Sequence, residues 1–344
     1  MSKIGLFADV HVHPYARFSS VSAETGLNSW VEQALTVLNQ IYAECEKRGI
    51  TDVYCLGDLF HTGPRLDTRT FNAVYRFFQR TRSGWTTLIA GNHDQLTRYG
   101  SESALYSLEN AHDRVHVVED SCLNGNSILL LPYTENYRDV QHQLTGWNSD
   151  RKIVLGHLAV QGAVVGRHEY QPEEGCHPSW LDQADLVLLG HYHKRQSVTD
   201  KVQYIGSTMS IDFNDADEQK GFTILDTETL ETEFVPIGSK KFLVFDDGPL
   251  QGSQIARGGY DGSIVRVDYS GELDEEKTRA LMLERGAVAV TFKCTAPRQS
   301  ALRVAEDDPR DAVQVYVDEA HDGTDGDTLV SLGRDIIRSV ELAR

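Results

Sequence analysis

The sequence lacks several features that would place a protein in a well-marked class. No apolar run among its 344 residues approaches the roughly 18 residues that a membrane-spanning helix requires. The five cysteines are scattered and never spaced as CxxC, so a zinc–thiolate site is not expected and a reducing compartment is favoured. The first residues lead straight into an apolar segment, which argues against a signal peptide. We therefore expect a cytoplasmic protein without a membrane contact.

An excess of basic charge is also missing. The chain carries 33 Lys and Arg against 51 Asp and Glu, which gives a net charge of −18. Proteins that bind nucleic acid usually present a basic surface, so the net charge alone favours an acidic protein without a polyanionic partner. Bound divalent cations would offset part of the charge locally. The motifs must therefore decide between these classes.

Five short polar clusters stand out, each at the end of an apolar segment that has the character of a buried strand. The most informative is Gly-Asn-His-Asp at residues 91–94, which follows a strand-like run. The others lie at residues 9–11, 57–61, 156–157 and 190–193. All five carry Asp, Asn or His, which packing alone does not explain. They predict one metal site assembled from loops on a rigid sheet.

The order of expected elements predicts an α/β fold. Alternating strands and helices over residues 4–90 indicate a largely parallel core sheet. Strands then crowd residues 115–236, as in two packed sheets flanked by helices. We therefore expect a four-layer αββα core.

A composition change near residues 238–262, where glycines break any regular pattern, predicts a domain boundary. A strand, a helix and a second strand are expected after it, which together make a small α/β module. Residues 328–342 have the apolar spacing of an amphipathic helix, preceded by an acidic linker. The expected divisions are a core domain, a small α/β domain, and a linker with a C-terminal helix: 1–240, 241–320 and 321–344.

The polar clusters contain the residue types that two divalent metal ions need. Phosphoester hydrolysis requires charge neutralised on the phosphate and a hydroxide at neutral pH, and two ions about 4 Å apart supply both. Asp58 is the natural bridging ligand, because it follows a strand and a glycine. The expected ligands are carboxylates, imidazoles and one amide: Asp9, His11, Asp58, Asn92, His157, His191 and His193. The residues alone do not decide how the last two histidines divide between the ions.

Two further histidines are candidates for chemistry on the phosphate. His93 precedes Asp94, and a carboxylate beside a histidine fixes its tautomer and favours its charged form. His93 would then protonate the leaving oxygen or stabilise charge on the phosphate. His61 follows Asp58 by three residues, so it is expected to lie over the same site and help to orient the phosphate.

Two patterns allow other interpretations. His11 and His13 also match the HxH start of amidohydrolase-type metalloenzymes. That class does not require the turn at residues 91–94, so we expect His13 at the mouth of the site and not as a ligand. Several arginines would share one helical face, which is either an ordinary solvated face or a stripe that follows a phosphate backbone. They are Arg65, Arg69, Arg76 and Arg80.

The five clusters together resemble the signature of the calcineurin-like metallophosphoesterases: DxH, GDxxH, GNHD, GH and GHxH, in this order. The resemblance covers residues 1 to about 235. The segment 204–222 is also similar to the tail of the nuclease subunit of SbcCD-type DNA repair complexes, through Tyr-Ile-Gly-Ser, Asp-Phe and Lys-Gly-Phe. That subunit carries a small α/β capping domain, which the module after residue 240 resembles. The chain length is similar to that of the phage versions.

This resemblance implies two manganese ions, although Fe, Zn or Mg suits similar ligands. One ion would be held by Asp9, His11, Asp58 and His193, and the other by Asp58, Asn92, His157 and His191. His93 would be the catalytic acid, with Asp94 orienting it and His61 near the phosphate.

The resemblance also implies a function in DNA recombination and repair. The reaction would be exonucleolytic and endonucleolytic cleavage of DNA, performed by a homodimer with an SbcC-like coiled-coil ATPase as partner. A phage-encoded chain would act in the host cytoplasm. The alternative is a small-molecule or nucleotide phosphodiesterase of the same superfamily. A third possibility is a catalytically weak scaffold, against which the intact ligand set argues.

Overall fold

The computed structural model describes residues 3–80, 84–97, 102–216, 218–245, 260–295 and 330–331. The chain divides into two compact units, one comprising Met1–Asp268 and Leu273–Lys293 and the other comprising Tyr269–Glu272 and Cys294–Arg344. The expected linker and helix over 321–344 lie outside the described residues, apart from residues 330 and 331. Among the described residues, none of the helices combines the length and the hydrophobicity of a membrane span.

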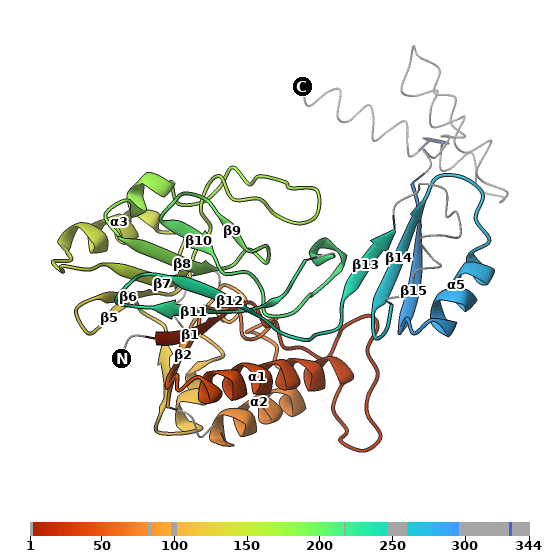
Figure 1. Cartoon of the computed structure of the whole chain (residues 1–344), viewed down its shortest axis with the longest axis horizontal. Coiled ribbons are helices and arrows are strands. Elements are labelled where there is room, and N and C mark those ends of the chain that lie inside the picture. Colours follow the sequence, from red (N-terminus) through yellow and green to blue (C-terminus); the bar gives the residue numbers. More distant parts are fainter. Residues whose placement is uncertain are drawn as a thin grey trace, which may run out of the picture. The chain divides into compact units, whose positions relative to one another are not determined.

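Two six-stranded sheets form the core of the first unit (Figure 1). The first has the order β12-β11-β1-β2-β3-β4, and β1 to β4 run parallel to one another. The antiparallel pairing of β11 with β1 extends the sheet on the other side. Its strands are β1 (Lys3–Phe7), β2 (Asp52–Cys55), β3 (Trp85–Ile89), β4 (Val115–Val118), β11 (Gly221–Asp226) and β12 (Thr232–Pro236).

The second sheet has the order β5-β6-β7-β8-β10-β9. Its four central strands, β6, β7, β8 and β10, are parallel. Its strands are β5 (Cys122–Asn124), β6 (Ile128–Leu131), β7 (Ile153–His157), β8 (Leu186–Gly190), β9 (Gln196–Ser197) and β10 (Val202–Tyr204). The late crowding of strands in the sequence therefore corresponds to this second sheet and to both edges of the first, namely β4 on one side and β11 with β12 on the other.

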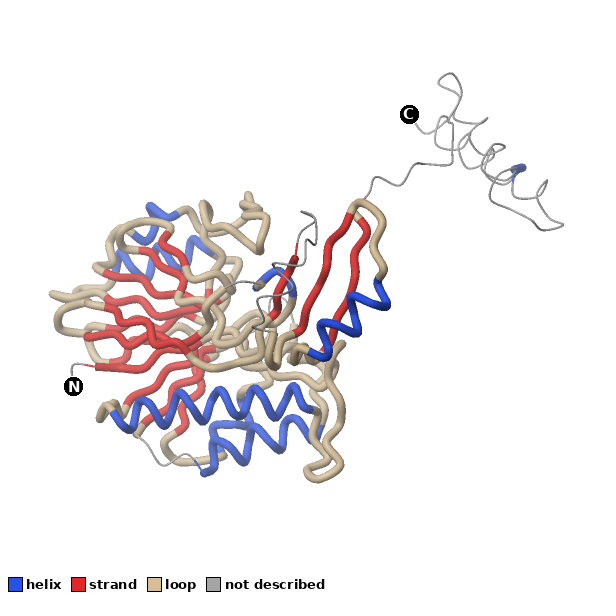
Figure 2. The backbone as a smooth tube through the Cα atoms, turned by 45° about the vertical axis from the view of Figure 1, so that its right-hand side comes forward, coloured by secondary structure: helices blue, strands red, loops and turns tan. Residues whose placement is uncertain are grey.

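Helices cover the outer face of each sheet (Figure 2). Helices α1 (Ser29–Lys47) and α2 (Thr68–Arg80) pack on the first sheet through one large apolar cluster. Helix α3 (Tyr137–Gly146) packs on the second sheet through another. A third cluster joins side chains of both sheets, such as Leu6 and Leu188, in the layer between them. The expected four-layer αββα core is therefore confirmed.

A three-stranded sheet, β13-β14-β15, follows the core. It consists of β13 (Phe242–Phe245), β14 (Ile264–Tyr269) and β15 (Ala289–Cys294), with helix α5 (Glu275–Glu284). Tyr260, Val265 and Met282 belong to its own apolar cluster. However, the ring of Phe242 also packs on core aromatic rings, 5.0 Å from Phe213 between centroids. The division into domains at residue 240 stays a prediction, because β13 is part of both cores.

Candidate metal centre

The five polar clusters of the sequence lie at the carboxyl ends of central strands in both sheets. Strands β1, β2 and β3 of the first sheet each lead into one cluster, while β7 and β8 of the second sheet supply the others. Ligand sites of open α/β sheets form at this edge, because neighbouring parallel strands all end there. The packing of the two sheets brings both sets of loops to one place.

The backbone at this edge is strained at several candidate ligands. Asp9, His11, Asp58 and His191 have positive φ values of 53°, 48°, 54° and 107°. They are four of the six non-glycine residues with positive φ in the described ranges. Such a conformation costs about 1–3 kcal/mol per residue and concentrates at functional sites. The strain points to a requirement for these side-chain directions that stability alone would not impose.

Two glycines allow the loops to approach closely enough. A Cβ atom on Gly57 would lie 2.1 Å from Nδ1 of His157, and one on Gly91 would lie 2.1 Å from Oδ1 of Asp58. Gly57 also has a φ of +94°, which a side chain would disfavour. The glycines of the GDxxH and GNHD motifs therefore make room for the candidate ligands on the neighbouring loops.

One group of candidate ligands comprises Asp9, His11 and His193. Their ligand atoms all lie within 4.8 Å of one another. Nε2 of His193 is 3.2 Å from Nε2 of His11. Asp9 and His11 are buried, whereas the side chain of His193 is 30% exposed.

A second group comprises Asp58, His157 and His191, again with ligand atoms within 4.8 Å of one another. The amide oxygen of Asn92 joins this group, since it lies 3.1 Å from Nε2 of His157 and 3.0 Å from Nδ1 of His191. Oδ2 of Asp58 is 3.3 Å from His157 and 3.6 Å from Nε2 of His11. Asp58 therefore lies between the two groups, where a bridging carboxylate would lie.

Burial and close charges shift the pKa values of these side chains in opposite directions. Burial raises the pKa of Asp9 to about 6, and it lowers the pKa of His191 to about 3 and that of His11 well below its usual value. Burial opposes charge on Asp58 and His157 as well, but their attraction for each other outweighs it. As a result, the pKa of Asp58 falls below its usual range and that of His157 rises to about 9.

These donors fit divalent metal ions. Carboxylate oxygens, imidazole nitrogens and one amide oxygen converge at short distances, and such a mixed set suits Mn, Fe or Zn. Buried carboxylates also require compensating positive charge. The structure therefore provides two candidate His/Asp metal-binding clusters.

Two histidines of the site are oriented by backbone carbonyl groups. Nδ1 of His157 donates to the carbonyl oxygen of Leu56 over 2.7 Å, and Nδ1 of His93 donates to that of His61 over the same distance. A hydrogen bond at Nδ1 fixes the direction of the ring and therefore of Nε2. In His157, Nε2 faces the side-chain oxygens of Asn92 and Asp58.

The expectation that Asp94 orients His93 is wrong. The buried Asp94 carboxylate accepts hydrogen bonds from the backbone amides of Phe60 at 2.8 Å, Gly91 at 3.0 Å and Leu59 at 3.3 Å. It therefore joins the loops after β2 and β3, while His93 takes its partner from His61. Sequence adjacency was misleading because successive side chains of a tight turn point in different directions.

Three further histidines, His13, His61 and His93, lie beside the candidate ligands. Ligand atoms of His11, His61 and His93 lie within 4.8 Å of one another, and the ring of His13 is 4.4 Å from that of His61 between centroids. His61 and His93 line a cavity of about 370 Å³ together with Asn92 and Tyr133. The proposed catalytic side chains thus adjoin both the metal clusters and an open space.

Two polar residues near the site were not identified from the sequence. Asp215 and Lys220 are both buried, and Oδ2 of Asp215 lies 3.4 Å from Nδ1 of His193. The similarity of segment 204–222 to the SbcCD-type tail was the only signal that pointed to this region. It assigned no role to either residue.

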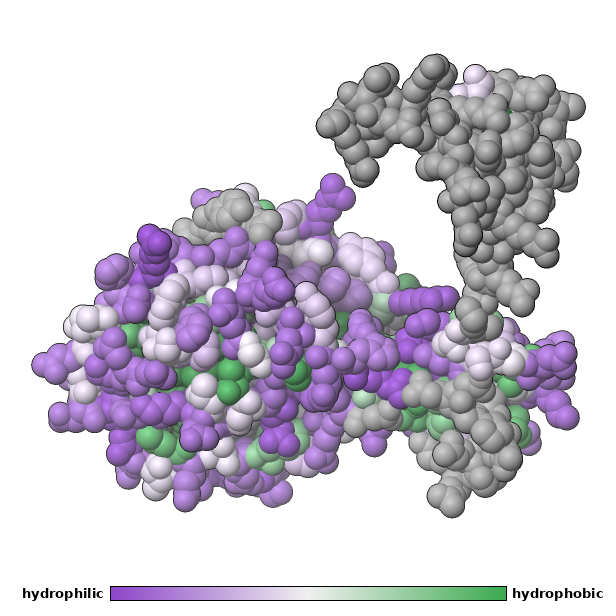
Figure 3. Space-filling view, turned by 90° about the horizontal axis from the view of Figure 1, so that it is seen from above, coloured by the Kyte–Doolittle hydropathy of each residue, from purple (hydrophilic) through white to green (hydrophobic). Residues whose placement is uncertain are grey.

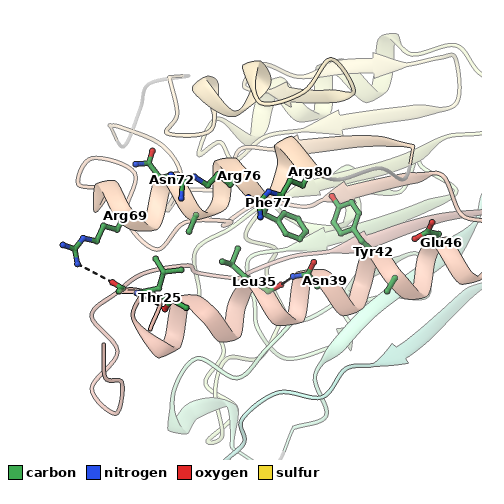
Figure 4. Close-up of a pocket in the computed structure, with 14 residues that line it drawn as sticks. Thr25, Leu35, Asn39, Tyr42, Glu46, Arg69, Asn72, Arg76, Phe77 and Arg80 are labelled. Carbon is green, nitrogen blue, oxygen red and sulfur yellow. Dashed lines mark hydrogen bonds between the residues drawn. The ribbon is translucent and has the colours of Figure 1, made fainter. Parts of the chain in front are cut away.

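Three of the four arginines that were expected to share one helical face line the same groove. Arg69, Arg76 and Arg80 line a groove of about 930 Å³ between α1 and α2 (Figure 4), whereas Arg65 is not among its lining residues. Apolar side chains such as Phe77 form part of the groove, and none of its lining residues is a candidate metal ligand. A phosphate-following role for these arginines stays a prediction.

Comparison with known proteins agrees with this geometry. The family model of the calcineurin-like phosphoesterases matches residues 2–195, which is more than half of the chain. Exonuclease subunit 1 of Enterobacteria phage T4 is 26% identical over 211 residues, which cover 58% of this chain and 60% of that protein. Putative phosphoesterase 078R of Invertebrate iridescent virus 3 is 28% identical over 292 residues, which cover 77% and 78%.

The SbcD subunit of the SbcCD nuclease of Staphylococcus epidermidis is 27% identical over 215 residues, which cover 52% of this chain and 53% of that protein. The chain thus spans between about half and three fifths of the length of the two named nucleases. These findings confirm the resemblance drawn from the five motifs. The chain therefore belongs to the calcineurin-like phosphoesterase family, whose members hydrolyse phosphoester bonds.

Proposed function

We propose that the chain is a two-metal, manganese-dependent DNA exonuclease and endonuclease, the nuclease subunit of an SbcCD-like recombination and repair complex. The main support for a site with two metal ions is the position of Asp58. Its Oδ2 lies within 3.6 Å of imidazole nitrogens from both candidate clusters. The similarity to T4 exonuclease subunit 1 and to the staphylococcal SbcD supports a nucleic acid as the substrate.

In this proposal each ion has four protein ligands. When bound, the ions neutralise charge on the phosphate and activate the attacking water. Asp58 is shared, and Asn92 adds a neutral oxygen to one side. The two ligand sets are Asp9, His11, Asp58 and His193, and Asp58, Asn92, His157 and His191.

His93 is the proposed general acid. Its Nδ1 proton is held by the carbonyl of His61, so in the doubly protonated ring Nε2 is the nitrogen that gives its proton to the leaving oxygen, which leaves a neutral imidazole. Its backbone amide donates to Oδ1 of Asp58 over 2.9 Å, which couples its position to the bridging carboxylate. His61 completes this side of the site by orienting the phosphate.

The proposed partners are a second copy of the chain and an SbcC-like coiled-coil ATPase. Support comes from the staphylococcal relative SbcD, which is one subunit of the SbcCD nuclease. A capping domain at 241–320 and a docking helix at 328–342 belong to the same proposal. The location that fits it is the cytoplasm, of the host if the chain is phage-encoded.

A small-molecule or nucleotide phosphodiesterase is the second candidate, and the charge of the chain favours it. A net charge of −18 repels a polyanion, and Figure 3 shows a face that is mostly hydrophilic. The same two-metal chemistry would serve a small ester equally well.

One assay separates the two candidates. Purified chain with Mn²⁺ is offered linear duplex DNA and, in parallel, bis-p-nitrophenyl phosphate, with Asp58→Ala as the inactive control. The proposal expects both substrates to be cleaved by the wild type and neither by the control. Cleavage of the small ester with no effect on DNA, with and without an ATPase partner, would leave only the second candidate.

A further inference from the structure

A buried network of charged side chains lies next to His193. Asp215 is 3% exposed and Lys220 is 5% exposed, which is unusual for charged residues unless they are paired. Oδ1 of Asp215 lies 3.3 Å from Nζ of Lys220, and its Oδ2 lies 3.4 Å from Nδ1 of His193. Asp215 therefore bridges a buried lysine and a candidate metal ligand.

The same network holds the backbone of His193. Nζ of Lys220 donates to the carbonyl oxygen of His193 over 3.0 Å and to Oε2 of Glu218 over 2.7 Å. An ammonium group has three donors, and these two bonds plus the contact with Asp215 account for all of them. Lys220 thus neutralises Asp215 and fixes the main chain at His193.

Local structure places Asp215 where it can do this. It ends a short 3-10 helix, Phe213–Asp215, whose first turn is capped by the side chain of Asp212. The backbone amide of Ile211 donates to Oδ2 of Asp215 over 2.7 Å. Lys220 immediately precedes β11, which belongs to the first sheet. The network therefore ties a loop of the site to the rigid core.

This arrangement differs from that of the other oriented histidines. His157 and His93 each donate a hydrogen bond from Nδ1 to a backbone carbonyl oxygen. Only His193, among the histidines of the described site, has a carboxylate at Nδ1 that also pairs with a buried lysine. A carboxylate partner fixes the tautomer of the ring. It also makes the opposite nitrogen a more basic metal ligand than a carbonyl partner does.

We propose that Asp215 and Lys220 are positioning residues that hold His193 with Nδ1 protonated and Nε2 directed at the metal cluster of Asp9 and His11. This inference rests on the proposed metal site. Nε2 of His193 is already 3.2 Å from Nε2 of His11, as ligands of one ion would be. Loss of the carboxylate would weaken one of the two metal sites and leave the other.

The first test reads the tautomer of His193 without any metal. Long-range ¹H–¹⁵N correlation spectra of the metal-free protein, at about pH 9 where an imidazole is usually neutral, report which ring nitrogen carries the proton. The His193 signals are assigned by their absence in His193→Gln. We expect protonation at Nδ1 in the wild type and a shift towards Nε2 in Asp215→Asn, whose amide can donate to Nδ1. A wild-type ring protonated at Nε2 overturns the proposal, and this result requires no variant of Asp215.

The second test measures Mn²⁺ binding by calorimetry in wild type, Asp215→Asn and Asp215→Glu. We expect two sites in the wild type, with one weakened at least about tenfold in Asp215→Asn and partly restored in Asp215→Glu. Asp226→Asn is the matched control, because Asp226 also accepts backbone amides in a turn but contacts no candidate ligand. Its two affinities should stay within about twofold of the wild type.

The outcomes separate this inference from the proposed function. If Asp215→Asn leaves both the tautomer and both affinities unchanged, the positioning role is wrong, whatever the DNA assay shows. If the wild type fails to cleave DNA but shows the expected tautomer and the loss of one site in Asp215→Asn, the positioning role stands and the nuclease proposal fails.

Discussion

At the scale of single residues, the proposed function assigns metal binding to Asn92 and proton transfer to His93, which are neighbours in sequence. Oδ1 of Asn92 lies among the imidazole nitrogens of one metal cluster, whereas the ring of His93 is held by a carbonyl of the next loop. A change at one of the two positions should therefore leave the function of the other intact.

Replacement of His93 tests this separation. We expect His93→Ala to retain two bound metal ions and to lose about 10²–10⁴ in kcat, which is the usual contribution of a general acid. The measurements are metal content by mass spectrometry and steady-state turnover of bis-p-nitrophenyl phosphate. A variant that loses a metal ion along with its activity would contradict the assignment and would make His93 a ligand.

Asp94 should behave as a structural residue. In Asp94→Ala three backbone amides, those of Leu59, Phe60 and Gly91, lose a buried acceptor. Each such loss costs about 1–3 kcal/mol, so we expect the free energy of unfolding to fall by about 3 kcal/mol or more. Urea unfolding of the metal-free protein measures this. An unchanged unfolding free energy with a reduced kcat would instead restore the idea that Asp94 orients His93.

At the scale of elements, the loops after the strands carry the geometry of the site. The turn at Gly57 is the clearest case, because its φ is +94° and the ring of His157 fills the space where a side chain would be. Strand β2 and strand β7 belong to different sheets, so this one contact helps to set the distance between their ends.

Gly57→Ala should therefore disturb the metal site as well as the fold. The Cβ atom would lie 2.1 Å from Nδ1 of His157, so the ring must move away from its carbonyl partner. We expect Mn²⁺ affinity to fall at least about tenfold. Gly26→Ala is the control: Gly26 also has positive φ, but no atom lies within 4 Å of its Cβ position. Equal losses of affinity in both variants would assign the effect to backbone strain alone.

The sequence allowed the layers and the clusters to be predicted, since strand-length apolar runs and strand-end polar residues are local signals. It did not allow α3 to be predicted, because only Val140 and Leu144 are buried in its ten residues. Strand β13 was missed because its pairing with β14 lies across a glycine-rich segment. Contacts between distant segments, such as Asp215 with His193, leave no periodic pattern in the sequence and required the structure.

At the scale of the whole molecule, the acidic charge and the metal site are connected. A net charge of −18 opposes both compaction and the approach of DNA. Two divalent ions would add four positive charges where the buried carboxylates Asp9 and Asp58 lie. Metal loading should therefore affect the stability of the entire chain as well as its chemistry.

Metal binding should raise the thermal stability of the first unit. Ions that bind only the folded chain stabilise it by about 2.7 kcal/mol per site when their free concentration is a hundred times the dissociation constant. We expect Mn²⁺ to raise the melting temperature of EDTA-treated protein in a concentration-dependent way, followed by differential scanning calorimetry. NaCl at the same ionic strength controls for screening of the net charge, which any salt would supply. Asp58→Ala separates the two effects further, because it lacks the bridging ligand but keeps nearly the same net charge. A Mn²⁺-induced rise of equal size in Asp58→Ala would show that the ions act on surface charge and would contradict a shared carboxylate at the centre of the site.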